Sequence, residues 1–258
     1  MSGAARSLSK DEAFEEVLQL QTDGVILLEG AATADQVSLD GWDPVLAQKS
    51  NGNVAGVVIR YLPSGTLTSG TPSGGSAPDR LDPRNALALI RLCQWLSDNY
   101  GVTELYHLGI SGGGTDAEGN PRVDCHGQGR AVDFAGVRGS TADAGEFGLT
   151  VRDDWGTADT TFTPGGDWPA GTGENVQYRL DDPAADQFAA GFFRDVYAFI
   201  TSEWQDRSDG PDDPGGSSIG EHSFVMNPDH PTSSPGRPNG REAHRNHLHM
   251  QIGKTGTE

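Results

Sequence analysis

The stretch CHGQGRAVD at residues 125–133 decides the fold. Its two glycines allow a tight turn and β-prone residues follow, so the pattern predicts a turn that leads directly into a strand. His126 then lies in the turn and Asp133 in the strand, where Asp133 shares one face with the small Ala131. An unpaired carboxylate that points into a sheet is costly, and a bound cation would remove that cost. A surface hydrogen bond between His126 and Asp133 is the alternative interpretation.

A second stretch, NHLHMQI at residues 246–252, predicts the last strand of the sheet. Residues i and i+2 of a strand lie on one face, so His247 and His249 point the same way. Alone, such a pair is also typical of two exposed polar residues on an edge strand. Combined with an inward carboxylate, two histidines supply the three ligands of a catalytic zinc site, whose fourth position is left for water.

Outside these two stretches, hydrophobic periodicity predicts the remaining helices and strands. Helices are expected at residues 10–22, 83–100 and 184–204. A capping box at residues 9–12 marks the start of the first, and an Asp-Pro pair marks the start of the second. The other strands are expected at residues 53–62, 102–110 and 132–134. This order is typical of an α+β fold with a mostly antiparallel central sheet flanked by helices.

A loop rich in Gly, Ser, Thr and Pro at residues 64–78 is the best candidate for a domain boundary. We therefore expect an N-terminal extension of unknown role at residues 1–79, followed by the main domain at residues 80–258. A long surface loop within one domain fits the same composition equally well.

Charge and hydropathy exclude several classes of protein. Lys and Arg number 18 against 37 Asp and Glu, and the resulting net charge of −19 disfavours binding to nucleic acid or to anionic lipid. No stretch approaches the roughly 20 apolar residues of a membrane span. The start, MSGAARSLSKDEAFEE, has no apolar h-region, so we expect a chain that is cytoplasmic as synthesised. Cys93 and Cys125 are expected to be free thiols, with a single bridge between them as the alternative.

The two motifs HxxGxAxD (126–133) and HxH (247–249), in that order, resemble the zinc peptidases of the LAS group. Within this group the match is closest to the D-Ala-D-Ala carboxypeptidase and murein endopeptidase branch. The segments LYHLGI and CHGQGRAVDFAGV are similar to the bacterial extensin-like C-terminal domain of that branch. The resemblance covers about residues 80–252 and implies a hedgehog/D-Ala-D-Ala-peptidase-like fold with a Zn²⁺ cofactor.

Carried over residue by residue, the resemblance makes His126 and Asp133 the first two zinc ligands and His249 the third. His247 matches the position of a Glu or His that orients or deprotonates the attacking water. Two departures from the family pattern are visible. Asp124 stands where the family has Ser, and could accept a hydrogen bond from a ligand histidine. The family's cationic anchor for the substrate carboxylate is not recognisable.

Arg122 is the candidate for that missing anchor, with Arg130 and Arg138 as alternatives. Glu242 could replace His247 as the base if the last strand begins earlier. Of the remaining histidines, we expect His107 to pack within its strand, His244 to lie in the cleft or on the surface, and His222 and His230 to lie in loops.

The resemblance implies a zinc-dependent peptidase that hydrolyses D-amino-acid-containing peptide bonds of bacterial peptidoglycan, as a carboxypeptidase or an endopeptidase. The expected partner is a peptidoglycan stem peptide or a related D-amino-acid peptide. Without a signal peptide, we expect an endolysin, an effector carried out by a delivery apparatus, or a cytoplasmic dipeptidase. The alternatives are a non-catalytic zinc-binding or structural module of the same fold, and a metal-dependent hydrolase of a non-peptide amide.

Overall fold

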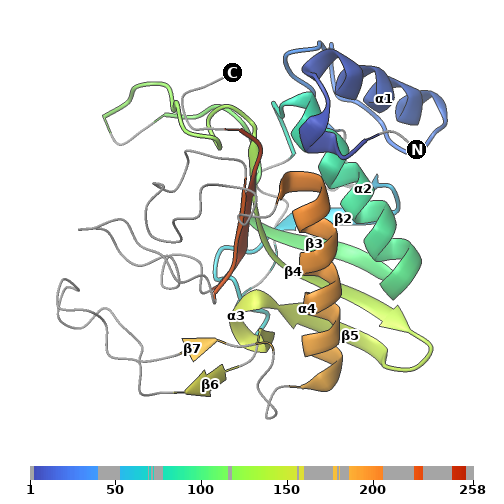
Figure 1. The fold of residues 1–258 in the computed structure, drawn as a ribbon, viewed down its shortest axis with the longest axis vertical. Helices are drawn as coiled ribbons and strands as arrows, with labels where there is room; N and C mark the ends of the chain where they lie inside the picture. Colours follow the sequence, from blue (N-terminus) through green and yellow to red (C-terminus); the bar gives the residue numbers. More distant parts are fainter. Residues whose placement is uncertain are drawn as a thin grey trace.

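A mixed β-sheet lies at the centre of the structure, and helices cover one of its faces (Figure 1). The computed structural model describes residues 3–39, 53–68, 70, 72, 78–115, 118–155, 157–159, 177–178, 180, 186–205, 224–228 and 246–253. In chain order the elements are η1 (Ala5–Ser7), α1 (Lys10–Thr22), β1 (Asn53–Val54), β2 (Val57–Tyr61), α2 (Pro83–Tyr100), β3 (Val102–Gly109), β4 (Ala131–Thr141), β5 (Gly145–Thr150), α3 (Val151–Asp154), β6 (Thr157–Asp159), β7 (Gln177–Tyr178), α4 (Gln187–Ile200), the π-helical turn η2 (Thr201–Gln205), β8 (Phe224–Met226) and β9 (Leu248–Gln251).

The strands of the main sheet run in the order β1-β2-β3-β4-β9-β8, and β5 pairs with β4 outside this path. Only β2 and β3 are parallel among these pairs, and the other neighbours are antiparallel. Strands β6 and β7 form a separate antiparallel pair. The predicted α+β class with a mostly antiparallel sheet is therefore confirmed.

Local sequence signals explain where the helices begin and end. The Ser9 hydroxyl accepts from the Glu12 backbone N–H at 3.2 Å, and the Glu12 carboxylate accepts from the Ser9 N–H at 2.8 Å, which confirms the capping box. Asp82 caps α2, with Pro83 at its first position. Gly101 ends α2 at φ +57°, where a Cβ would lie 2.2 Å from the Ser140 carbonyl oxygen, so only glycine fits.

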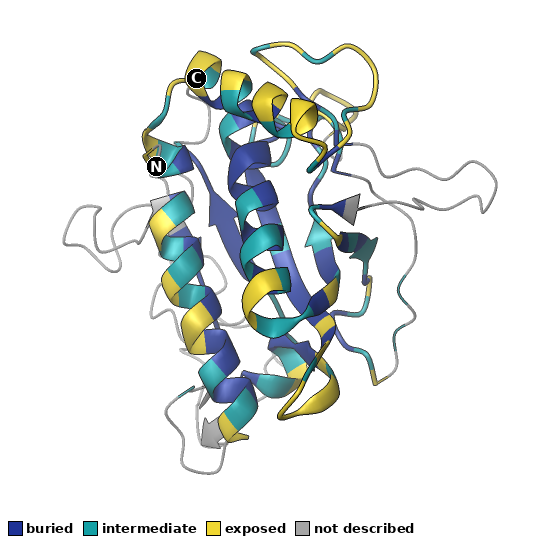
Figure 2. Cartoon of the chain, turned by 90° about the vertical axis from the view of Figure 1, so that its right-hand side faces the viewer, coloured by how far each residue is buried: buried dark blue, intermediate teal, exposed yellow. Residues whose placement is uncertain are grey.

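One hydrophobic core fills the space between the sheet and helices α2 and α4, whose buried sides face the strands (Figure 2). Val57 and Ile59 of β2 belong to this core, together with Leu105 of β3 and Phe134 of β4. Helix α1 packs against α2. The described part of residues 1–79 thus shares the sheet and core of the main domain, while its separate role stays a prediction.

Three predicted elements differ from those observed by more than one residue at an end. The single strand expected at residues 53–62 is a hairpin, because Ala55 (φ +53°) and Gly56 (φ +90°) form a two-residue turn between β1 and β2. The strand expected at 132–134 extends over residues 131–141. The helix expected at 184–204 is helical as α4 from Gln187 and continues as the π-helical turn η2.

No helix in the part of the chain that the structure describes is both long enough and apolar enough to cross a membrane.

Asn85, which is fully buried on α2, links this helix to the segment before β4. Its Nδ2 donates to the Gly129 carbonyl at 2.9 Å, and its Oδ1 accepts from the Trp204 indole N–H at 2.8 Å. Asn85→Ala leaves the buried indole without this acceptor, so we expect the free energy of unfolding to fall by about 1–3 kcal/mol. Urea unfolding measures this loss. Asn99→Ala, at an exposed position of the same helix, is the control and should change stability by less than about 0.5 kcal/mol. Equal losses in the two variants would contradict the linking role.

Candidate metal centre

A tight turn immediately before β4 carries His126. The Asp124 carboxylate accepts from the Gly127 backbone N–H at 2.7 Å, and the Gly129 N–H donates to the His126 carbonyl at 2.9 Å. Gly129 has φ +70°, and a Cβ there would lie 2.2 Å from the Arg80 carbonyl oxygen. Glycine is therefore required at this position, as the sequence pattern predicts.

The register between β4 and β9 places the other ligand candidates together. Asp133 lies directly opposite His249, and Val132 lies opposite Met250. Val132 and Met250 belong to the hydrophobic core, so Asp133 and His249 project from the opposite face of the sheet, away from that core. The structure thus brings together two residues that are 116 positions apart in the chain.

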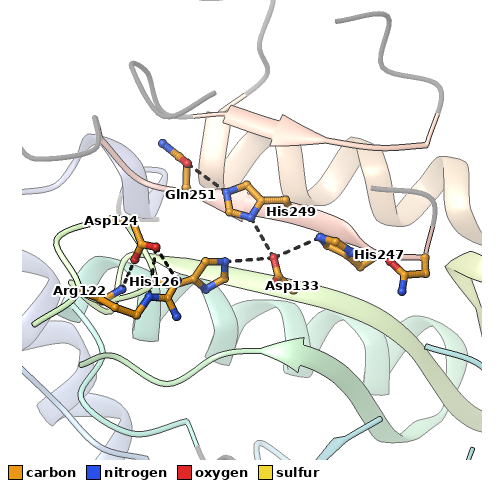
Figure 3. A network of polar contacts seen from close by, with 9 residues as sticks. Arg122, Asp124, His126, Asp133, His247, His249 and Gln251 are labelled. Atoms are coloured by element: carbon orange, nitrogen blue, oxygen red, sulfur yellow. Dashed lines mark hydrogen bonds and ion pairs between the residues drawn. The ribbon is translucent and has the colours of Figure 1, made fainter. Parts of the chain in front are cut away.

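Three imidazole nitrogens converge on a single oxygen, Oδ1 of Asp133 (Figure 3). Nδ1 of His249 lies at 2.9 Å, Nε2 of His126 at 3.2 Å and Nε2 of His247 at 3.4 Å. The side chains retain 10–17% exposure, so the cluster is not fully buried. The lone pairs of the ring nitrogens and of the carboxylate oxygen repel one another at these distances, and a bound cation would relieve that repulsion.

The pKa shifts reflect this crowding. Burial raises the pKa of the Asp133 carboxyl, but the three histidines outweigh that effect and hold the pKa well below its usual range. Burial lowers the pKa of His247, and the charges of the other two histidines act in the same direction, against the effect of Asp133. Burial also opposes the charged form of His249, yet the hydrogen bond and charge of Asp133 raise its pKa overall.

His126, Asp133 and His249 could hold a metal ion, because one donor atom from each lies within 4.8 Å of the others. In a tetrahedral zinc site, ligand bonds of about 2.0–2.2 Å place two donors roughly 3.3–3.6 Å apart. The distance of 3.2 Å from Oδ1 of Asp133 to Nε2 of His126 is close to that range, and the distance of 2.9 Å to Nδ1 of His249 is shorter than it. Two imidazoles and a carboxylate are also the donor types found in catalytic zinc sites. The residues therefore fit the metal.

Gly109, on β3, lies where a side chain would occupy the metal centre. A Cβ at this position would lie 2.8 Å from Oδ2 of Asp133 and 3.4 Å from Cε1 of His126. We expect Gly109→Ala to displace both ligands and to weaken zinc binding by roughly 10-fold or more, as measured by competition with a chelator. Gly191→Ala is the matched control, because a Cβ on this helical residue meets nothing within 4 Å. Equal zinc affinity in the two variants would contradict the close packing around Asp133.

The arginine proposed as the substrate anchor pairs with a neighbouring acid. The Nη2 atom of Arg122 lies 2.5 Å from Oδ2 of Asp124, and the side chain is 36% exposed. The carboxylate of Asp124 therefore fixes the turn and holds Arg122; a bond to a ligand histidine, which the sequence left open for Asp124, is not among its contacts in the described part of the chain. An anchoring role for Arg122 stays a prediction. Arg130 is buried and contacts Gln128, and Arg138 lies farther along β4, opposite Glu104.

Other predicted residues have different outcomes. His107 is fully buried in β3, as expected, and Cys93 and Cys125 are buried and form no disulfide. The residues His222, His230, Glu242 and His244 lie outside the described part of the chain.

Sequence reasoning missed three residues that contact the metal centre: Gly109, Asn246 and Gln251. Gln251 had a detectable signal, since it continues the two-residue spacing of His247 and His249 along a strand. Gly109 had none, because only the pairing of β3 with β4 brings it opposite Asp133.

No protein-family model matches the chain, and no curated protein or solved structure gives a significant match. The metal centre and the resemblance of its motifs therefore provide the basis for inferring a function.

Proposed function

We propose that this chain is a zinc-dependent peptidase that hydrolyses D-amino-acid-containing peptide bonds of bacterial peptidoglycan, as a carboxypeptidase or an endopeptidase. The observation that carries the proposal is the convergence of His126, His249 and His247 on one oxygen of Asp133. The resemblance to the LAS zinc peptidases, which implies a hedgehog-like fold, supports the substrate class. The high negative charge disfavours binding to nucleic acid.

The chain's own residues divide the work between holding the metal and moving a proton. His126, Asp133 and His249 would hold zinc. Bound zinc supplies Lewis acidity, which polarises a carbonyl group and lowers the pKa of water. His247 lies beside the ligands, with Nε2 directed at Asp133 and Nδ1 at 2.9 Å from Oδ1 of Asn246. In this position His247 would accept the proton of the attacking water and return it to the leaving amine.

Metal analysis tests the first half of the proposal. The protein is purified without added zinc, and its metal content is compared with that of the His126→Ala/Asp133→Ala double variant. About one zinc per chain in the wild type and none in the variant is expected from a three-ligand site. If neither protein takes up zinc when it is offered, the ligand assignment is wrong.

A substrate panel tests the second half. We expect the zinc-loaded wild type to cleave muropeptides and D-Ala-D-Ala peptides and to leave their all-L counterparts and simple non-peptide amides intact. Cleavage of the amides alone would favour the hydrolase alternative. Zinc binding without any cleavage would favour a non-catalytic module, and a secreted form with a cleaved signal would contradict delivery as an effector.

A further inference from the structure

Gln251 lies on the same face of β9 as His249, next to the metal centre. Its register partner on β4 is Ala131, two residues before Asp133. The side chains of Gln251, His249 and Asp133 therefore lie side by side on one face of the sheet. Gln251 is 2% exposed and His249 8% exposed. A buried amide and a buried imidazole are stable only when they are hydrogen-bonded, so their partners define how each side chain is oriented.

The contacts of Gln251 determine which end of its amide faces the histidine. Its Nε2 donates to the Gly253 carbonyl at 2.9 Å. Its Oε1 lies 3.0 Å from Nε2 of His249, the contact drawn in Figure 3. A carbonyl oxygen only accepts, so Gly253 holds the NH₂ end and the amide oxygen is turned toward the ring. An amide oxygen also only accepts, so Nε2 of His249 carries the proton.

The other nitrogen of this ring is then the one available to a metal. In a neutral imidazole that is protonated at Nε2, Nδ1 carries the lone pair. Nδ1 of His249 lies 2.9 Å from Oδ1 of Asp133, which is itself an acceptor when ionised. Two acceptors at this distance require a positive centre between them, either a proton or a metal ion.

His247 is turned the other way, with Nε2 and not Nδ1 toward Asp133. Oδ1 of Asn246 lies 2.9 Å from Nδ1 of His247, and Nε2 of His247 faces Asp133. His126 also presents Nε2 to Asp133. Among these rings, His249 alone turns Nδ1 toward the carboxylate, and it is also the ring whose Nε2 contacts Gln251.

We propose that Gln251 is a positioning residue that fixes the tautomer of His249, so that His249 binds zinc through Nδ1. The proposal rests on the metal-binding half of the proposed function and is independent of whether the chain cleaves peptides. Gln251 acts on His249 through its amide oxygen. A carboxylate at the same place supplies an acceptor oxygen but cannot donate to the Gly253 carbonyl.

Two substitutions separate this role from simple packing. Gln251→Leu keeps most of the volume and removes the acceptor, whereas Gln251→Glu keeps an acceptor oxygen next to His249. By chelator competition, we expect zinc to bind roughly 10- to 100-fold more weakly to the Leu variant, and to bind the Glu variant more tightly than the Leu variant because an acceptor for Nε2 of His249 remains. Gln19→Leu, at an exposed position of α1, is the control and should not change zinc affinity. Circular dichroism verifies that each variant is folded.

Nuclear magnetic resonance of the full wild-type chain tests the proposal without any variant. Histidine is labelled with ¹⁵N, the protein is loaded with ¹¹³Cd, and spectra are recorded above the usual titration range of histidine. We expect the metal to couple to Nδ1 of His249 and a proton to remain on its Nε2.

Coupling to Nε2, or equal zinc affinity in the wild type and a folded Gln251→Leu variant, overturns the role of Gln251. Failure of the wild type to bind either metal overturns both this proposal and the metal centre. Zinc binding through Nδ1 without peptide cleavage overturns the peptidase proposal alone.

Discussion

Asp133→Asn is expected to abolish zinc binding while leaving the fold intact. The two side chains have nearly the same shape, so the packing of β4 against β9 should persist. The substitution removes the negative charge that faces His126, His247 and His249 at 3.2, 3.4 and 2.9 Å. An amide oxygen is a poor zinc ligand compared with a carboxylate, and two histidines alone do not complete a site. The loss should therefore exceed the roughly 10- to 100-fold that follows from removing an outer partner.

Metal content after dialysis and chelator competition measure this effect. Asp195→Asn is the matched control, because Asp195 is an exposed acid on α4 that contacts the Tyr100 hydroxyl, not the metal centre. The control should retain about one zinc per chain. A zinc-loaded Asp133→Asn protein would show that the convergence of the three rings has another cause, such as a hydrogen-bonded cluster with a protonated histidine.

The parts of the fold that depend on local signals could be predicted from the sequence. The capping box at Ser9 and Glu12 fixes the start of α1, and Asp82 with Pro83 fixes the start of α2. These signals act through backbone groups within one turn of the residue that provides them. The turn that carries His126 belongs to the same class, because Gly129 adopts φ +70° there, a backbone conformation that favours glycine.

The errors arose where a partner strand determines the structure. Ala55 and Gly56 form a turn that is usually made by Asn-Gly or Asp-Gly, so the break between β1 and β2 had no strong signal. Strand β4 was predicted too short, and the part that was missed contains Gly136. In the structure this glycine lets β5 approach, since a Cβ there would lie 2.2 Å from the Leu149 carbonyl oxygen.

The composition of the metal centre was predictable, but its geometry was not. Side-chain alternation predicts which face of its strand Asp133 lies on, and it places His247 and His249 on one face of theirs. Their meeting depends on the register of β4 against β9, and a shift of one residue would turn His249 to the other side of the sheet. The observed register also explains why Gly109 and Gln251 belong to the site: each lies beside Asp133 or His249 only after the strands pair.

His247→Ala is expected to separate catalysis from metal binding. His247 approaches Asp133 but is not one of the three residues whose donors form the metal-binding group. Its removal should leave zinc content unchanged and reduce the turnover of a D-amino-acid-containing peptide by about 10²- to 10⁴-fold, which is the usual contribution of a general base. Single-turnover cleavage of a muropeptide, together with metal analysis of the same sample, measures both effects.

The outcome of His247→Ala distinguishes the candidate functions because each assigns the ring a different task. In a peptidase the ring moves a proton, so turnover falls and zinc stays. If His247 were a fourth ligand in a closed structural site, zinc affinity would fall instead, as expected for a non-catalytic module. Val123→Ala, at an exposed side chain near the turn, should change neither quantity. Asn246→Ala should give a smaller loss of turnover than His247→Ala, because it frees Nδ1 of His247 from its partner at 2.9 Å but leaves the base in place.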